Sequence, residues 1–126
     1  MKVAVFSDVQ AVLPALEAVI EHIEAWHPDM VVMAGDLVNR GPDSGGCLAL
    51  FDAMRREQGW LPVYGNHEVW VLRCGEEAPA SEGERDIRRF TDLAWQQVAD
   101  QAERLHGWPD HLCLHPPDAD AWLHVT

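Results

Sequence analysis

The sequence has few basic side chains and few cysteines, and each shortage excludes a class of protein. Nine Lys and Arg side chains stand against 21 Asp and Glu, which gives a formal net charge of −12. This charge opposes binding to bulk nucleic acid or to an anionic membrane, because like charges repel. The three cysteines, Cys47, Cys74 and Cys113, form no CxxC pair, which argues against a disulfide framework. We therefore expect reduced, mostly buried thiols.

Long hydrophobic runs are also absent. No stretch approaches the roughly 18 consecutive apolar residues that a membrane-spanning helix needs. The apolar opening of the chain is too short for a signal peptide, because the acidic Asp8 already ends it. A content of 48% hydrophobic and 24% charged residues is typical of a soluble globular protein. For 126 residues we expect one domain, residues 1–126, and a cytoplasmic location.

Short apolar runs that alternate with amphipathic segments predict an α/β fold. Residues 2–7 and 30–34 are apolar runs typical of buried strands, and residues 12–26 between them have the apolar spacing of a helix. This strand–helix–strand order predicts a parallel sheet covered by helices. Further along the chain we expect a third strand over 60–64 and a long helix over 84–105.

Turn and cap signals predict the remaining segments. An exposed loop is expected over 75–83, where small and acidic residues gather, and Ser81 with Glu84 resembles a capping box for the next helix. Two short strands are expected near 111–115 and 120–125. The side chains expected to form the buried stripe of helix 84–105 are Ile87, Phe90, Ala94, Val98, Ala102 and Leu105.

Polar residues follow each of the first three predicted strands. Asp8 follows the first, Asp36 the second, and Asn66 with His67 the third. Ligands of parallel α/β sheets bind at the carboxyl ends of the strands, so we expect these side chains to share one edge. Alone, each has a simpler explanation, because Asp is favoured at helix caps and Asn in tight turns. Their joint occurrence instead favours a site for a hard cation, with an imidazole able to transfer a proton.

Around these residues the sequence resembles the first three motifs of the calcineurin-like metallophosphoesterases, in particular the small bacterial members. Residues 7–10 (SDVQ), 35–42 (GDLVNRGP) and 65–68 (GNHE) are similar to D-x-H, G-D-x-x-(D)-R-G-P and G-N-H-(E/D), in this order. The resemblance implies a four-layer α/β/β/α sandwich. It also implies two divalent metal ions, which are Mn, Fe, Zn or Mg.

The resemblance implies a role for each matching residue. Asp8 would bind the first metal, Asp36 would bridge both metals, and Asn66 would bind the second. His67 would protonate the leaving group, and Arg40 would bind a phosphate oxygen through its planar guanidinium. A hydroxide held between the metals would attack the phosphorus of a small phosphomonoester or phosphodiester substrate.

Three features depart from the family pattern. Gln10 stands where the family has His, and an amide oxygen is a weaker ligand for transition metals than an imidazole. Asn39 stands where the protein-phosphatase branch has an Asp that orients the general acid. The family's later His motifs lack clear counterparts, with His124 the single candidate for the fourth and none for the fifth. We therefore expect an N-terminal part of the fold, with sheet edges open to pairing with another copy.

Two other functions stay open at this point. The same scaffold could bind a phosphorylated ligand or a protein partner without turnover. A receiver-like domain that binds Mg²⁺ and accepts phosphate on Asp would leave Asn66, His67 and Arg40 unexplained.

The role of Glu68 also stays open. This residue either supports the metal-binding residues from behind or only begins a helix.

Several other residues have both a structural and a functional interpretation. His111, Cys113 and His115 alternate along a predicted strand, and a half-buried strand explains this spacing as well as a metal site does. Four tryptophans are expected to pack in the core or at an interface, namely Trp26, Trp60, Trp95 and Trp122.

Overall fold

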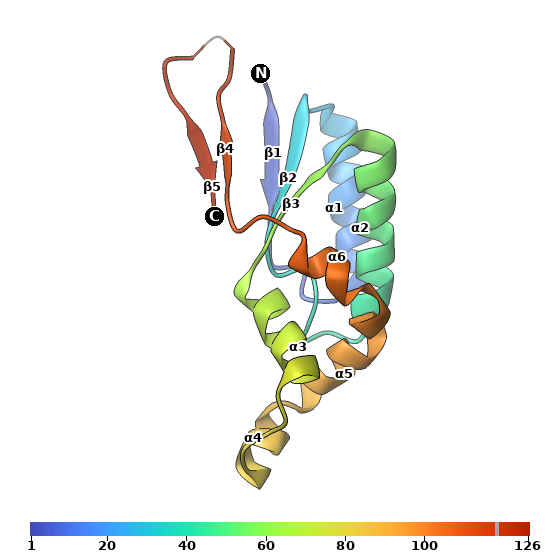
Figure 1. Ribbon diagram of the computed structural model, residues 1–126. Helices are drawn as coiled ribbons and strands as arrows, with labels where there is room; N and C mark the ends of the chain where they lie inside the picture. Colours follow the sequence, from blue (N-terminus) through green and yellow to red (C-terminus); the bar gives the residue numbers. More distant parts are fainter. Residues whose placement is uncertain (118) are drawn as a thin grey trace.

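The computed structural model describes residues 1–117 and 119–126. Its centre is a parallel sheet of three short strands in the order β1-β2-β3. Helices α1 and α2 lie on one face of this sheet, and the antiparallel hairpin of β4 and β5 lies against the other (Figure 1). The strands are β1 (Val3–Phe6), β2 (Met30–Ala34), β3 (Leu61–Val63), β4 (Leu112–Leu114) and β5 (Leu123–Val125).

The helices form two groups. Beside the sheet, α1 and α2 run antiparallel to the strands, whereas α3, α4 and α5 lie beyond the carboxyl ends of the strands (Figure 1). A 3₁₀ turn, η1, joins α5 to α6. The bounds are α1 (Leu13–Trp26), α2 (Ser44–Gln58), α3 (Asn66–Glu76), α4 (Glu82–Ile87), α5 (Arg89–Val98), η1 (Ala99–Gln101) and α6 (Ala102–His106).

The strand–helix–strand order predicted from the sequence is confirmed. β1 pairs with β2 in parallel, with Ala4 opposite Val31, and β2 pairs with β3, with Val32 opposite Leu61. One expectation was wrong: β1 is not fully buried, because it is an edge strand and the Val5 side chain is 48% exposed. Within the described residues the molecule has three layers of the sandwich: helices, sheet and hairpin.

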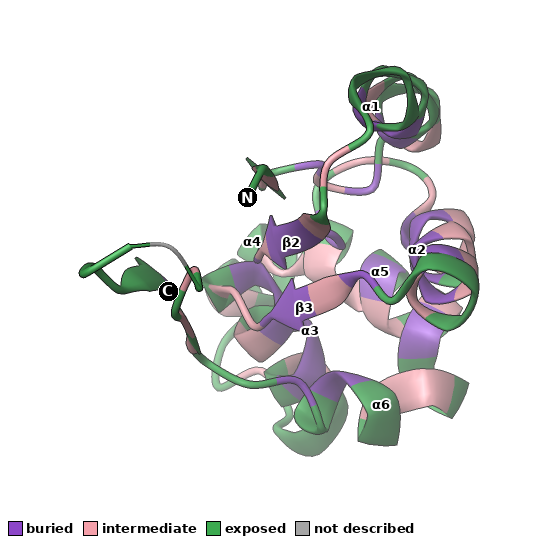
Figure 2. Cartoon of the chain, turned by 90° about the horizontal axis from the view of Figure 1, so that it is seen from above, coloured by how far each residue is buried: buried purple, intermediate pink, exposed green. Residues whose placement is uncertain are grey.

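Two apolar clusters hold these layers together. The larger lies between the sheet and the helices, where aromatic rings pack edge to face, as Phe51 does against Trp108 at 5.7 Å between centroids. The smaller joins the sheet to the hairpin and has Val32, Val63 and Val125 at its centre. Seen from above, β2 and β3 are buried between the helices and the hairpin (Figure 2). Burial of such apolar area is the main favourable contribution to folding.

The predicted helix over 84–105 was wrong in its length and in part of its buried face. The chain forms separate segments there, with a first break at Arg88. Ile87 is 82% exposed and Phe90 is 62% exposed, whereas Ala94, Val98 and Leu105 are buried as expected. The physical reason is a tertiary contact, because the Arg88 guanidinium donates to Cys74 Sγ and to the Glu77 carbonyl oxygen and ties this point to α3.

Other local expectations have mixed outcomes. The Ser81 hydroxyl accepts from the Glu84 N–H and caps α4 as predicted, but the loop before it is shorter because α3 continues to Glu76. All three cysteines are free; Cys47 is buried, Cys74 half-buried and Cys113 exposed.

The prediction that four tryptophans pack in the core or at an interface is also met only in part. Trp60 is buried and Trp95 packs against the larger core, whereas Trp26 and Trp122 are 46% and 61% exposed. In the described part of the chain, none of the helices has the length and apolarity needed to cross a membrane.

Candidate functional site

The loops that follow β1 and β2 run side by side at the carboxyl edge of the sheet. The N–H of Asp8 donates to the Gly35 carbonyl oxygen at 3.2 Å, and the N–H of Gln10 donates to the Asp36 carbonyl oxygen at 2.9 Å. Asp8 and Asp36 both have left-handed backbones, with φ values of 58° and 61°. Such conformations cost energy and persist only where the surroundings fix them. The two carboxylates therefore lie on adjoining, constrained loops.

The loop after β3 approaches the same place through a glycine. A Cβ added at Gly65 would lie 2.3 Å from Asp36 Oδ1, closer than any real Cβ approaches an oxygen. With glycine at this position, the His67 backbone N–H reaches Asp36 Oδ1 at 3.0 Å. The Gly-Asn-His sequence thus begins α3 directly against the Asp36 carboxylate.

A buried carboxylate, Glu68, joins the loops after β2 and β3. Its side chain is fully buried, and its two oxygens accept four backbone N–H groups at 2.9–3.2 Å, from Asp36, Leu37, Val38 and Gly65. Burial raises the pKa of the Glu68 carboxyl, and the N–H donors offset part of that increase. Glu68 also lies in the first turn of α3, so its position agrees with both interpretations left open above, and its role as a support for the site stays a prediction.

The geometry around His67 determines which ring nitrogen holds the proton. The Arg40 backbone N–H donates to Asn39 Oδ1 at 2.9 Å, so the amide of Asn39 turns its Nδ2 toward His67 Nδ1, 3.1 Å away. Because an amide nitrogen only donates, Nδ1 must accept, and the neutral ring holds its proton on Nε2. This Nε2 lies 3.9 Å from Asp36 Oδ2.

The remaining strand-end side chains face solvent. Asp8, Asn66 and Arg40 are exposed. The Asp8 carboxylate accepts from Ser7 Oγ at 2.5 Å and, at 3.4 Å, from Gln10 Nε2. Gln10 therefore donates to Asp8 through its amide nitrogen, and the amide oxygen of Gln10 does not face the Asp8 carboxylate. The arrangement brings Asp36, Asn39, His67 and Glu68 into direct contact, whereas the ligand roles of the exposed residues stay predictions.

His124 lies in a different contact. It stands opposite Cys113 across β4 and β5, with its Nδ1 3.3 Å from Cys113 Sγ. Its role as a distal metal ligand stays a prediction. Cys113 lies in β4, and His111 and His115 flank this strand. All three are exposed, and their alternation is what extended backbone alone requires.

The chemistry of the donors can be compared with the expected metals. The Asp8 and Asp36 carboxylates and the Asn66 amide offer hard oxygen donors, which suit cations such as Mg²⁺ or Mn²⁺. Within residues 1–117 and 119–126, no group of three or more His, Cys, Asp or Glu side chains could hold a metal ion. These residues thus fit part of the coordination of a divalent cation, and they do not complete a two-metal centre by themselves.

Sequence reasoning missed two residues at this site. The Ser44 hydroxyl, fully buried at the start of α2, accepts from the Asn39 N–H at 3.0 Å and fixes the loop that presents Asn39. The Trp70 ring lies 4.8 Å from the His67 ring. The i,i+3 spacing of His67 and Trp70 in a helix indicates this second contact, whereas the Ser44 contact has no comparable signal in the sequence.

Residues 1–124 match the model of the calcineurin-like phosphoesterases. The chain belongs to this family. Among its curated members, the chain is 35% identical over 114 residues to the symmetrical bis(5'-nucleosyl)-tetraphosphatase of Chromohalobacter salexigens, covering 86% of this chain and 37% of that protein. It is 52% identical over 44 residues to serine/threonine-protein phosphatase 1 of Salmonella typhimurium, covering 35% of this chain and 18% of that protein. The chain thus spans less than half the length of these relatives.

Solved structures show the same fold. A metallophosphoesterase from Sphaerobacter thermophilus matches with a TM-score of 0.65 and 27% identity, covering 89% of this chain and 42% of that one. A hypothetical protein from Pyrococcus horikoshii OT3 matches with a TM-score of 0.75 and 16% identity, over 90% of this chain and 50% of that one. The expectation of a calcineurin-like α/β fold is therefore confirmed.

Proposed function

We propose that this chain supplies the Asp, Asn and His part of a metal-dependent phosphoesterase site, which hydrolyses phosphomonoesters or phosphodiesters. The observation that supports this most directly is the setting of His67. Its side chain is only 8% exposed, and Asn39 fixes the proton on the nitrogen that faces Asp36. The Nε2–H of this buried ring is placed to donate toward a leaving oxygen, and the ring acts as a general acid when Nδ1 carries a second proton.

Each residue would contribute differently to the reaction. Asp8, Asp36 and Asn66 would hold divalent cations, which when bound lower the charge of the phosphate and activate water. The exposed Arg40 guanidinium binds phosphate oxygens, for which its paired N–H groups are well matched. The imidazolium form of His67 gives its Nε2 proton to the oxygen that leaves and so becomes a neutral ring. In that form Nδ1 also carries a proton, so the Asn39 amide must turn its Oδ1 toward the ring to hold it in place.

Metal-dependent hydrolysis by matched variants tests this proposal. With Mn²⁺, we expect the protein to hydrolyse p-nitrophenyl phosphate or its bis ester, and EDTA to abolish the reaction. His67→Gln should lower kcat at least about 100-fold, the usual contribution of one general acid. Asp36→Asn should also lower it, because it weakens a proposed ligand of the cations. Glu103→Gln, on the exposed face of α6, is the control and should leave the rate unchanged. Equal rates in His67→Gln and the parent protein would refute the assignment of the acid.

A binding module without turnover is the second candidate, and the contact of Gln10 favours it. Gln10 replaces the expected His ligand and donates to Asp8. Elemental analysis after loading with Mn²⁺ separates the two functions. If the site is a weakened enzyme, Gln10→His should raise both the bound metal and the rate. Bound phosphate without hydrolysis in either protein would instead indicate the binding module.

A further inference from the structure

A cleft of about 500 Å³ lies between α2, α6 and the start of β3. Seen from above, α6 lies on the same side of the sheet as α2 (Figure 2). The lining of the cleft includes three arginines and one carboxylate, namely Arg55, Arg56, Arg104 and Asp52. None of the strand-end residues proposed for the phosphoesterase chemistry belongs to this lining. The cleft is therefore separate from the site described above.

The charge of the cleft opposes that of the whole molecule. Three of the nine Lys and Arg side chains line it, although the chain carries 21 acidic side chains. Against these three cations, the described lining has one carboxylate, that of Asp52. Arg55 and Arg56 lie in the last turn of α2, and a helix C-terminus adds only about half a negative charge. An excess of positive charge therefore remains.

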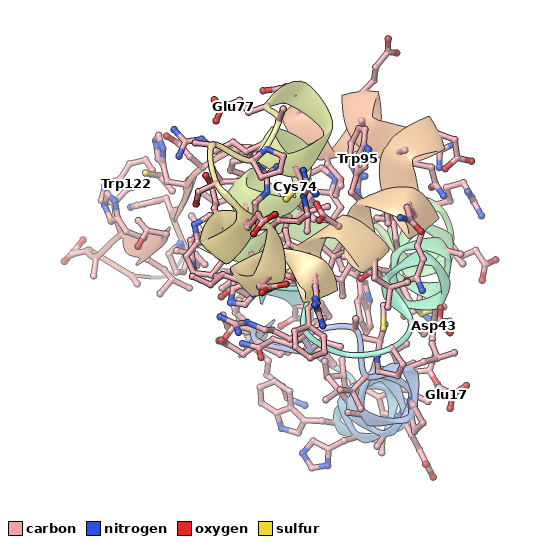
Figure 3. The ribbon with its side chains drawn as sticks, turned by 90° about the horizontal axis from the view of Figure 1, so that it is seen from below. Glu17, Asp43, Cys74, Glu77, Trp95 and Trp122 are labelled. Carbon is pink, nitrogen blue, oxygen red and sulfur yellow. The ribbon has the colours of Figure 1, made fainter. Side chains whose placement is uncertain are left out.

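Other acidic side chains do not pair with these arginines. Glu57 and Glu103 are exposed neighbours in the sequence, and in the described part of the chain they form no ion pair with the three arginines. Figure 3, which views the molecule from below, shows Glu17 in the first half of α1 and Asp43 at the start of α2. Asp43 is about 18 Å along the helix from Arg55. An anion in the cleft would thus meet cations without a matching set of carboxylates.

Two of the guanidinium groups are held in place before any ligand binds. Asp52, whose side chain is 7% exposed, accepts from Arg104 Nη1 at 2.8 Å on one oxygen and from Arg55 Nη1 at 3.4 Å on the other. The Arg55 guanidinium also lies over the Trp108 ring, 6.0 Å from its centroid. A guanidinium has five N–H groups, and the described hydrogen bonds use only the Nη1 group of each arginine. The others are free for an anion, which binds at a lower entropic cost because the groups are already ordered.

The need to balance Asp52 accounts for one arginine and leaves two unexplained. Arg56 is exposed and, among residues 1–117 and 119–126, forms no ion pair. We propose that the cleft binds a small dianion, of the phosphate or dicarboxylate type, between Arg55, Arg56 and Arg104. Guanidinium groups match the paired oxygens of both ligand types. A small ligand is favoured over a nucleic acid, because the net charge of −12 repels long polyanions.

Titration of the metal-free protein, followed by proton–nitrogen NMR, tests this site apart from catalysis. In EDTA, at constant ionic strength and above the second pKa of phosphate, we expect inorganic phosphate to shift the Gly59 and Trp60 amides saturably. Arg56→Gln and Arg104→Gln should each weaken phosphate binding about ten-fold, the equivalent of one charge-assisted hydrogen bond. Arg85→Gln is the matched control, because Arg85 is an exposed residue of α4 outside the ion pairs of the described residues. It should leave the affinity unchanged.

The outcomes decide between a specific site and general screening of charge. Succinate, titrated in the same way, distinguishes the two ligand types, and saturable binding of either one that depends on Arg56 supports the cleft. Equal shifts with chloride, or equal weakening by Arg56→Gln and Arg85→Gln, would overturn it. Phosphate shifts confined to the surroundings of Arg40 would place the anion at the strand ends and overturn it too. Since Arg56 has no ion pair to lose, Arg56→Gln keeps the test valid even if Arg104→Gln destabilises the fold.

Discussion

At the scale of single residues, the Glu68 carboxylate is the most consequential polar group outside the proposed chemistry. Its oxygens hold four backbone N–H groups from the loops after β2 and β3, whereas the Asp36 carboxylate joins these loops through one backbone N–H, that of His67. In Glu68→Gln, the new NH₂ group would face two of these donors. Since a buried donor without an acceptor is costly, we expect a loss of about 3 kcal/mol in the free energy of unfolding.

Urea denaturation followed by circular dichroism measures this loss. Glu57→Gln, on the exposed end of α2, makes the same chemical change at the surface and should alter the free energy of unfolding by less than about 0.5 kcal/mol. Equal, small effects of the two substitutions would show that the Glu68 network does not stabilise the fold.

The tautomer of His67 is a second prediction at this scale. Because Asn39 Nδ2 donates to Nδ1, the ring should hold its proton on Nε2. In Asn39→Asp, a carboxylate oxygen replaces the donor and the proton should move to Nδ1. Nitrogen-15 chemical shifts of the His67 ring report the two tautomers directly. An Nδ1-protonated ring in the parent protein would contradict the assigned amide orientation.

Cys47 gives a pH-dependent prediction. Burial raises the pKa of its thiol to about 11, and the nearby Asp43 and Glu17 carboxylates add to the increase. The folded protein therefore keeps a proton that the unfolded chain releases from about pH 8.5 upward. Unfolding then releases a proton, so stability falls as the pH rises toward 11. Urea midpoints at pH 8 and 10.5 should fall less in Cys47→Ala than in the parent, and an equal fall would contradict this origin.

At the scale of elements, two helical glycines have opposite surroundings. A Cβ at Gly75 in α3 would lie 2.2 Å from the Trp95 ring of α5, whereas a Cβ at Gly83 in α4 meets its nearest atom at 3.9 Å. Alanine normally stabilises a helix over glycine by up to about 1 kcal/mol. We expect this gain for Gly83→Ala, but a loss of about 1–3 kcal/mol for Gly75→Ala through overpacking.

Thermal unfolding distinguishes the two glycine substitutions. The double substitution Gly75→Ala with Trp95→Leu should recover part of the loss, because the smaller side chain vacates the space needed by the new methyl group. A stabilising Gly75→Ala would show that α3 and α5 separate more easily than their packing indicates.

The elements also show how far the sequence determines this structure. The first strands and α1 follow from apolar periodicity, because a parallel sheet buries continuous apolar runs. The break at Arg88 could not be predicted, since periodicity continues through it and the cause is a contact with Cys74, 14 residues earlier.

The sequence likewise predicts only part of the candidate site. Strand ends and motif spacing predict that Asp36 and His67 approach each other, and the structure places them in contact. The left-handed backbones of Asn39 and Arg40, with φ values of 77° and 66°, could not be predicted. They depend on hydrogen bonds such as that to Ser44, which only the folded chain assembles.

At the scale of the whole molecule, the outer edge of β1 is the surface most suited to self-association. Val5 is 48% exposed there, beside the exposed Trp26 of α1, and both line a surface hollow of about 580 Å³. An apolar edge strand can pair with another chain. We expect concentration-dependent dimers of the parent protein in sedimentation equilibrium.

A charged residue at this edge should prevent the association. Val5→Lys should be monomeric, because lysine on an edge strand disfavours pairing. Leu93→Lys places the same charge on a residue of α5 that is 45% exposed and should leave the dimer intact. A monomeric parent protein, or a dimer insensitive to Val5→Lys, would exclude the β1 edge as the interface.

The four N–H groups bound by Glu68 have a shared dynamic consequence. Asp36, Leu37, Val38 and Gly65 all donate to one carboxylate. Whenever that side chain swings away, all four amides lose their acceptor together. Their hydrogen–deuterium exchange is then controlled by one opening event, so amides that follow two different strands should exchange as a single cooperative group.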